Sequence, residues 1–274
     1  MSYEGNVGAF FDLDGTLLPR PSVERRFILF LLMRGLIGLA QFARCGARFI
    51  ANITRNRHAA IGANKAYFSG VSTRCVDEWS RQLASHPVKF FSDGVDRLKF
   101  HFAQGHRIFL ITGAPTPLAE LVGSYSLVPL TIVGTQLEAR DGSWMGEITG
   151  EHISGEAKRR AIVRLAAAYR LDLARSFAYG DSVSDLPMLE TVGHPAAVNP
   201  SASLERAARA RNWPVIYWGC WQGHWRGRWC ERWRRRSWRE AQSPRVENSR
   251  DAVQISPTLH ASFMQSINFR GTHR

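Results

Sequence analysis

The chain has 274 residues, 45% of them hydrophobic, which is enough for one large domain or two modest ones with a packed core. Its 36 Lys and Arg against 23 Asp and Glu give a formal net charge of +13. This charge favours anionic partners such as phosphoesters, acidic lipids or nucleic acid, but it does not bear on the fold. The four cysteines form no C-x-x-C pair and no Cys/His cluster, so we expect reduced thiols in a cytoplasmic protein. Residues 1–6 carry no basic segment, and we expect no signal peptide.

Residues 7–11 are a short apolar run, which is typical of a buried strand. Asp12 and Asp14 follow it with one apolar residue between them, and Gly15 then permits a tight turn. Alternate side chains on a strand point the same way, and two close carboxylates repel unless a cation or a proton lies between them. The stretch predicts a Mg²⁺-assisted site with an Asp nucleophile and an Asp acid/base. An acidic turn after a strand explains it equally well when it is taken alone.

Residues 21–85 are predicted to be helical. They include two apolar runs, 27–33 and 35–43, separated by Arg34, and together these runs are marginal in length for a membrane span. A polar stripe on the helical wheel contains Arg34, Gln41, Arg44, Arg48 and Arg55. We interpret the segment as a small helical domain whose basic stripe is solvated. The alternative is a helix that lies at a membrane surface or presents Arg to an anionic substrate.

From residue 86 onward, apolar strand-like runs alternate with helical segments, which predicts a parallel sheet covered on both faces. We therefore expect an α/β fold with a Rossmann-like parallel-sheet core at 1–20 and 86–218. An α-helical cap is inserted at 21–85, and a basic Trp/Arg-rich tail follows at 219–274. The predicted strands are 107–111, 130–133, 176–179, 196–198 and 215–218, with a hairpin at 136–139 and 144–148 and helices at 117–122, 155–169 and 204–210.

Polar groups follow three of the predicted strands, and a lysine lies near the start of a helix. Because parallel strands bring their carboxyl ends to one edge of a sheet, we expect these groups to converge. A phosphoryl group bound there needs a nucleophile, a metal, hydrogen-bond donors and a counter-charge. Each residue alone has an ordinary structural explanation, but their joint occurrence favours a site. The groups are Asp12 and Asp14, Thr112 and Gly113, Lys158, and Asp181 and Asp185.

In this order, the segments resemble those of the haloacid dehalogenase superfamily. The likeness is to its subfamily IB, the phosphoserine-phosphatase-like branch with a helical cap after the first motif. The resemblance spans residues 7–218, and the set of four motifs is specific where any single one is weak. The matching segments are Asp12-Leu13-Asp14-Gly15-Thr16, Leu110-Ile111-Thr112-Gly113, Lys158 and Gly180-Asp181-Ser182-Val183-Ser184-Asp185.

The resemblance implies a Mg²⁺-dependent phosphomonoesterase that works through an aspartyl-phosphate. Asp12 is the implied nucleophile and Asp14 the implied acid/base. Transport ATPases of similar sequence carry Thr in place of Asp14, so this residue favours a phosphatase. The implied metal site comprises Asp12, the main-chain carbonyl of Asp14, Asp181 and the supporting Asp185, and the implied phosphate-binding residues are Thr112, Gly113 and Lys158.

Two departures affect the substrate. Phosphoserine phosphatases carry a Glu shortly after the first motif that meets the substrate amine, whereas Glu24 is displaced from that place, and Ser184 stands where those enzymes usually have Asn. The segment 110–121 is also similar to a phosphatidylglycerophosphatase of the same branch. The first hypothesis is therefore a small phosphorylated metabolite resembling phosphoserine. The second is a membrane-associated phosphatase for a lipid phosphate resembling phosphatidylglycerophosphate.

A third hypothesis concerns the tail, in which tryptophans alternate with seven Arg between residues 226 and 239. Aromatic rings interleaved with Arg suit stacking and phosphate contact, so the tail could bind an anionic membrane surface or nucleic acid. The intact set of four motifs argues against a purely binding role, and we do not expect nucleic acid as the partner. We expect residues 241–274, which are polar and aperiodic, to be disordered.

Overall fold

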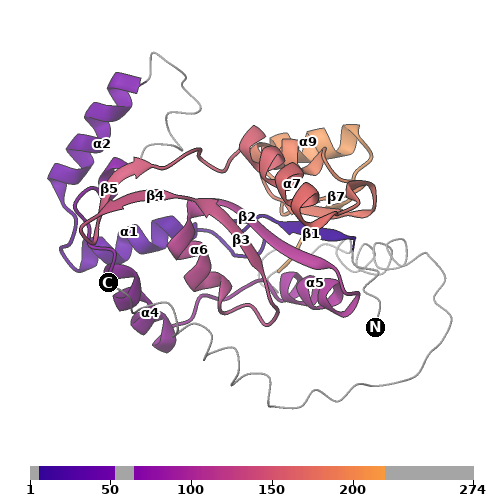
Figure 1. Ribbon diagram of the computed structural model, residues 1–274, viewed down its shortest axis with the longest axis horizontal. Coiled ribbons are helices and arrows are strands. Elements are labelled where there is room, and N and C mark those ends of the chain that lie inside the picture. The colour runs from indigo at the N-terminus through magenta and orange to yellow at the C-terminus, as the bar shows by residue number, and fades with distance from the viewer. Residues whose placement is uncertain (1–5, 53–64, 220–274) are drawn as a thin grey trace, which may run out of the picture. The chain divides into compact units, whose positions relative to one another are not determined.

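The computed structural model describes residues 6–52 and 65–219, so the predicted tail lies almost wholly outside the described residues. Six parallel strands form the central sheet in the order β3-β2-β1-β6-β7-β8 (Figure 1). This confirms the predicted Rossmann-like α/β fold. The strands are β1 (Gly8–Phe11), β2 (Arg107–Pro115), β3 (Thr131–Thr135), β6 (Phe177–Gly180), β7 (His194–Val198) and β8 (Val215–Ile216).

The sheet has one core layer on each face because successive strand residues point to opposite sides. Phe11 belongs to one layer and Phe10 to the other, and neither is exposed. The layer with Phe11 contains side chains from α1 (Val23–Met33), α4 (Cys75–Ser85), α5 (Ser92–Ala103) and α6 (Thr116–Gly123). The layer with Phe10 contains side chains from α7 (Glu156–Tyr169), α8 (Leu186–Leu189) and α9 (Ala202–Ala210) (Figure 1).

The segment predicted to be helical begins with α1, continues with α2 (Leu39–Asn52) and the short η1 (Ala66–Phe68), and ends with α4. Ser22 caps α1, since its hydroxyl accepts a hydrogen bond from the N–H of Arg25 at 3.3 Å. None of the described helices is long and apolar enough to cross a membrane.

The predicted hairpin is confirmed as β4 (Leu137–Arg140) and β5 (Ser143–Ile148). It packs against the helical segment: the N–H of Gly70 donates to the carbonyl of Trp144 at 2.8 Å, and the N–H of Trp144 donates to Val71 at 2.9 Å. The ring of Phe27 on α1 lies 5.9 Å from that of Trp144 and 5.2 Å from that of Trp79. The helical segment and the hairpin therefore share one aromatic cluster.

The strand predicted at 107–111 is longer than expected, because β2 continues to Pro115. Its pairing with β3 shifts register between Ile111 and Pro115 and then resumes at Pro115 with Thr135. Thr112 and Gly113 consequently lie inside the irregular part of β2 rather than after its end. Asp12 follows the last residue of β1, and Asp181 follows the last residue of the neighbouring β6, so both carboxylates start from one edge of the sheet.

A buried histidine ties α5 to the sheet. Nε2 of His101 lies 2.9 Å from the hydroxyl of Tyr179, and its Nδ1 lies 2.8 Å from Nδ1 of His106. Burial, with smaller contributions from His106 and Arg97, lowers the pKa of His101 to about 2. The ring is therefore neutral in the folded protein at any pH near neutrality.

Replacing His101 with Gln should make the free energy of unfolding less dependent on pH below neutrality. In the unfolded chain His101 takes up a proton below about pH 6.5, whereas the folded chain does not, so folding is destabilised as the pH falls. One such group contributes up to about 1.4 kcal/mol per pH unit. Urea unfolding at about pH 7 and pH 5 should show a smaller loss for His101→Gln than for the wild type. The exposed His86→Gln is the control, and equal losses in His101→Gln and the wild type would contradict the assignment.

Candidate active site

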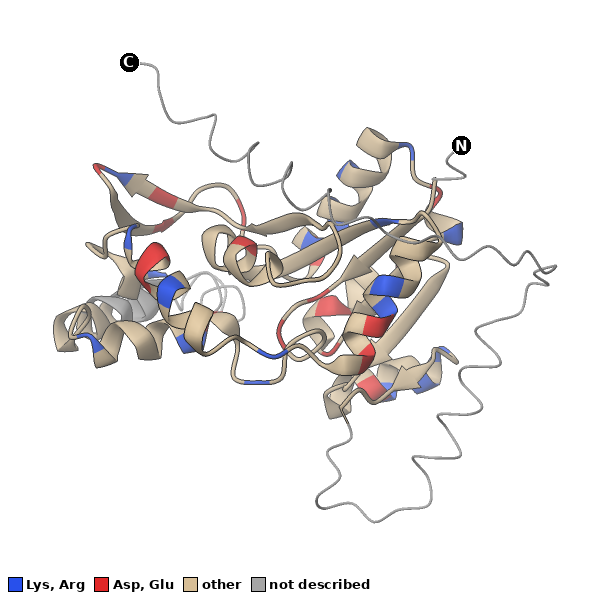
Figure 2. Ribbon diagram, turned by 90° about the horizontal axis from the view of Figure 1, so that it is seen from below, with Lys and Arg blue, Asp and Glu red and all other residues tan. Residues whose placement is uncertain are grey.

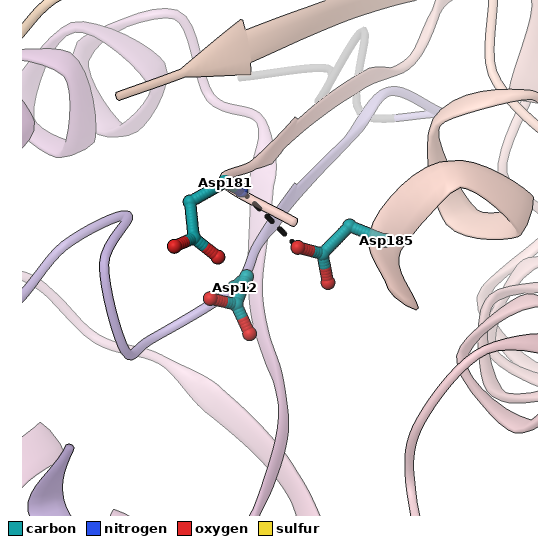
Figure 3. Close-up of side chains that lie close together, drawn as sticks. All are labelled: Asp12, Asp181 and Asp185. Carbon is teal, nitrogen blue, oxygen red and sulfur yellow. Dashed lines mark hydrogen bonds between the residues drawn. The ribbon is translucent and has the colours of Figure 1, made fainter. Parts of the chain in front are cut away.

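Three carboxylates meet at the edge of the sheet (Figure 3). One oxygen each from Asp12, Asp181 and Asp185 lies within 4.8 Å of the others, and all three residues are buried. The backbone N–H of Asp12 donates to the carbonyl of Tyr179 at 2.9 Å, which extends the pairing of β1 and β6 past their ends. The pattern predicted from the strand ends thus brings these residues together.

Lys158, near the start of α7, lies between two of these acids. Its Nζ is 2.5 Å from Oδ1 of Asp12 and 2.6 Å from Oδ1 of Asp185. Although burial disfavours its charge, the two carboxylates raise the pKa of Lys158 above its usual value. Lys158 therefore stays protonated and supplies the predicted counter-charge to the cluster.

Arg20 is the second cation of the cluster, and its NH2 lies 2.8 Å from Oδ2 of Asp181. The Arg20 side chain is 72% exposed, whereas that of Asp181 is 5% exposed. The pair therefore links a solvent-facing guanidinium to a buried acid. Burial is the largest cause that raises the pKa of Asp181, and the hydrogen bond from Arg20 opposes this rise.

Asp185 holds the loop that follows β6. Its Oδ2 accepts a hydrogen bond from the N–H of Asp181 at 3.1 Å (Figure 3). It also accepts from the N–H of Ser182 at 3.0 Å and from the Ser182 hydroxyl at 2.9 Å. A Cβ on Gly180 would lie 2.5 Å from that of Asp185, so only glycine fits there. Asp185 thereby fixes the backbone from which Asp181 projects while its other oxygen faces Lys158.

Asp14 lies in the turn after β1, and its carboxylate contacts the start of α1 and is not part of the three-acid cluster. Its Oδ1 accepts a hydrogen bond from the N–H of Val23, the first residue of α1, at 2.7 Å. Gly15 has φ +96°, and a Cβ there would lie 2.1 Å from Oδ2 of Asp181, so the turn requires glycine. The resemblance implies that Asp14 would bind the metal through its main-chain carbonyl and not through its carboxylate.

The two acids after β1 differ in environment. Burial raises the pKa of Asp14 to about 6, although the N–H of Val23 stabilises its charged form. Burial also raises the pKa of Asp12, with Lys158 acting in the opposite direction. A carboxyl group that titrates near pH 6 can both give and take a proton close to neutrality.

Thr112 and Gly113 line the opening beside Asp12. The hydroxyl of Thr112 accepts a hydrogen bond from the N–H of Ala114 at 3.1 Å, and that of Thr135 donates to the Gly113 carbonyl at 2.9 Å. The Thr135 hydroxyl also accepts from the N–H of Ile153 at 3.2 Å. Thr135, which ends β3, therefore orients the peptide of Gly113.

A cavity of about 330 Å³ contains every predicted site residue except Asp185. Where residues 21–85 line the cavity, both carboxylate oxygens of Glu24 lie within 2.7 Å of Nζ of Lys65, and the hydroxyl of Tyr67 also contacts Glu24. Arg25 lines the cavity, and its exposed side chain has no ion pair with the described residues. The cavity is also lined by Arg20, Pro21, Ser22, Ala114, His152, Ile153, Ser154, Ser182 and Ser184.

The donor set suits a hard divalent cation. Asp12, Asp181 and Asp185 offer oxygens only, which Mg²⁺ prefers, and their spacing allows a single ion to reach more than one of them. These three acids face two cations, Lys158 and Arg20, so one formal negative charge remains uncompensated. The described residues of the cluster therefore fit the predicted Mg²⁺.

The sequence patterns did not indicate Thr135, which orients the Gly113 peptide, or several residues that line the cavity. Thr135 carried a usable signal, because it ends a strand at the same edge of the sheet, and Arg20 lies four residues after the first matching segment. Lys65 and His152 carried none, since nothing in their surroundings separates them from other polar residues. Nδ1 of His152 lies 3.1 Å from the Thr135 hydroxyl, and burial lowers the pKa of His152 to about 4.

Known proteins with related sequences include phosphatases. A phosphoserine phosphatase of Mycobacterium tuberculosis is 29% identical over 220 residues, which cover 76% of this chain and 70% of that protein. A histidinol-phosphatase of Neisseria meningitidis is 25% identical over 219 residues, covering 76% of this chain and 97% of that one. The crystal structure of a Bordetella pertussis protein of unknown function is 28% identical with a TM-score of 0.63, covering 77% of this chain and 98% of that chain.

The family model for haloacid dehalogenase-like hydrolases matches residues 9–190. This range starts within β1 and ends after Asp185, so it contains all the predicted site residues. The match, together with the sheet order and the carboxylate cluster, agrees with the resemblance inferred from the sequence. The chain belongs to the haloacid dehalogenase-like hydrolase family.

Proposed function

We propose that the protein is a Mg²⁺-dependent phosphomonoesterase that works through an aspartyl-phosphate on Asp12. The observation that carries the proposal is the buried group of Asp12, Asp181 and Asp185 around the ammonium of Lys158. Membership of the hydrolase family and the phosphatase names of two relatives support it.

In the proposed reaction, a carboxylate oxygen of Asp12 attacks phosphorus while the bond from phosphorus to the leaving oxygen breaks. Asp14 gives its proton to that leaving oxygen and then takes one from a water molecule. The water oxygen attacks the phosphorus of the aspartyl-phosphate, which releases inorganic phosphate and restores Asp12. The raised pKa of Asp14, about 6, suits both proton transfers.

Charge on the phosphoryl oxygens would be met by several groups of the cavity. Lys158 offers its ammonium, Thr112 its hydroxyl and Gly113 its N–H. Asp12, Asp181 and the carbonyl of Asp14 would hold Mg²⁺, with Asp185 in support. When bound, Mg²⁺ would neutralise developing charge and favour the ionised form of the nucleophile.

Asp14→Asn should slow turnover by about 10² to 10⁴ fold for a substrate with a poor leaving group, because general acid–base help is lost. A small amount of phosphoenzyme should accumulate, since its hydrolysis lacks a base. Rapid quench with ³²P-labelled substrate, followed by acid precipitation, would measure the trapped phosphate.

The matched control is Asp12→Asn, which removes the nucleophile and should abolish both turnover and labelling while leaving the circular dichroism spectrum intact. Chelation by EDTA should stop turnover by the wild type, and added Mg²⁺ should restore it. Near-wild-type turnover by folded Asp12→Asn would contradict the mechanism, and a loss below about tenfold in Asp14→Asn would contradict its acid–base role.

Thr135→Val should weaken phosphate binding, because the peptide of Gly113 loses the hydroxyl that orients it. One hydrogen bond is worth about 1 kcal/mol, so the inhibition constant for inorganic phosphate should rise about fivefold. Thr135→Ser keeps the hydroxyl and should behave as the wild type. Unchanged phosphate inhibition in a folded Thr135→Val would show that Thr135 acts on stability alone.

We propose a small phosphorylated metabolite as the substrate, and phosphoserine is the first one to assay. Phosphoserine carries an ammonium and a carboxylate next to its phosphoester. In the cavity, Glu24 already has the ammonium of Lys65 on both its oxygens, so it has little affinity left for a substrate amine. Arg25 has a free guanidinium among the described residues and would meet the carboxylate.

Two analogues separate these contacts. Phosphoserine without its amine, 3-phosphooxypropanoate, should keep kcat/KM within about threefold, whereas phosphoethanolamine, which lacks the carboxylate, should lose about tenfold or more. Arg25→Gln should remove this preference, and Arg206→Gln, an exposed arginine of α9, should not.

A large loss of kcat/KM for the analogue without the amine would contradict the inference that Lys65 keeps Glu24 from binding a substrate amine. If all three compounds are inert while an aryl phosphate is cleaved, the phosphoserine-like substrate is wrong and the phosphatase activity stands. A lipid phosphate would then be the next substrate class to assay.

We also propose that residues 21–85 form a lid over a core made of residues 1–20 and 86–218. The hydrogen bond from Val23 to Asp14 links the first helix of this lid to the turn after β1. Glu24, Arg25 and Lys65 line the cavity from the same segment. A lid of this kind would exclude water that competes for the aspartyl-phosphate and would select the leaving group.

A further inference from the structure

An apolar surface is exposed where α1 ends and α2 begins. We call it the α1–α2 surface. Leu39 is 90% exposed and Met33 is 66% exposed, values far from those of a packed core. The surface consists of Leu29, Leu32, Met33, Leu36, Leu39 and Phe42.

The α1–α2 surface is the outer side of helices whose inner side is already packed. On α1, Leu29 and Met33 are four residues apart and share one side, while Phe27 and Leu31 are buried in the core layer. Among the described elements, α2 packs chiefly on η1. The exposed side chains are therefore not needed to hold the helices in place.

The chain segment that carries this surface has charged residues of one sign. The sequence contains no Asp or Glu from Arg25 to Val76, but it contains eight Arg and one Lys there. The sequence of α2 accordingly contains no Asp or Glu, and Figure 2 marks the basic and acidic positions of the described backbone. Arg34, which lies between the exposed side chains of α1 and α2, is itself exposed, and its guanidinium is 5.5 Å from the ring centre of Phe30.

We propose that the α1–α2 surface docks on an anionic lipid bilayer. Leucine, methionine and phenylalanine side chains would enter the boundary between headgroups and acyl chains, and the surrounding arginines would meet lipid phosphates. A segment of more than fifty residues without an acid suits an anionic surface better than a protein partner of mixed charge. In this arrangement the protein lies on the membrane through the α1–α2 surface.

The proposal stands apart from the phosphatase chemistry, because none of the residues in the α1–α2 surface lines the cavity. Membrane docking can therefore be lost while catalysis is retained, and catalysis can be lost while docking is retained. Two other occupants could cover the same side chains, namely a second copy of the chain or a soluble protein, and the experiment distinguishes them from lipid.

The test is flotation of the full chain with vesicles of phosphatidylcholine, alone or with about one third phosphatidylglycerol. The double variant Leu29→Glu with Met33→Glu places two acids on the surface. One charge close to such a membrane changes the binding free energy by about 1 kcal/mol. The partition coefficient of the double variant between vesicles and water should therefore fall about tenfold or more. The matched control is Leu127→Glu, an exposed leucine (72%) outside the α1–α2 surface.

The proposal predicts that the wild type and Leu127→Glu bind the anionic vesicles, less so at about 0.5 M salt, and that the double variant does not. Hydrolysis of an aryl phosphate should be unchanged in the double variant, which shows that it is folded. Wild-type binding by the double variant would overturn the proposal and assign binding to another part of the chain. It is equally overturned if the wild type ignores anionic vesicles, or if it is a dimer that the double variant converts to a monomer without any lipid effect.

Discussion

The contact of the Lys158 ammonium with Asp12 and Asp185 is the interaction on which the rest of the site depends. All three groups are almost fully buried, and a charge so placed is costly unless it is paired and hydrogen-bonded. The triad joins the end of β1, the first turn of α7 and the loop after β6. Removing Lys158 would leave two buried carboxylates without their counter-charge, so the same contact serves folding and the proposed chemistry.

A second constraint is the crowding of acids in one place. Asp181 and Asp185 can approach Asp12 because Gly15 and Gly180 leave room for their side chains. Lys158 and Arg20 offset part of the negative charge, and the remainder favours a divalent cation. The environments of the two acids after β1 also differ: Asp12 faces the cluster, whereas Asp14 faces the N-terminus of α1. This difference lets two neighbouring carboxylates take different parts in the proposed reaction.

The fold and the position of the carboxylates were predictable because they follow from local patterns. Apolar runs gave the strands, and parallel pairing carries Asp12 and Asp181 to one edge of the sheet. The predicted end of β2 was wrong, because the pairing of β2 with β3 resumes after an irregularity that no local sequence pattern indicates. The hairpin was predicted as a unit, but its packing on Phe27 and Val71 depends on side chains from a distant part of the chain.

What sequence patterns do not show is which charges cancel one another. Glu24 and Lys65 are 41 positions apart in the sequence, and the ammonium of Lys65 contacts both oxygens of the Glu24 carboxylate. Thr135 reaches the Gly113 peptide across 22 positions. In both cases, a contact between elements far apart in the sequence decides which group faces the cavity. In the proposed function, the reacting groups follow from a linear motif, whereas selection of the leaving group by residues 21–85 depends on contacts such as that between Glu24 and Lys65.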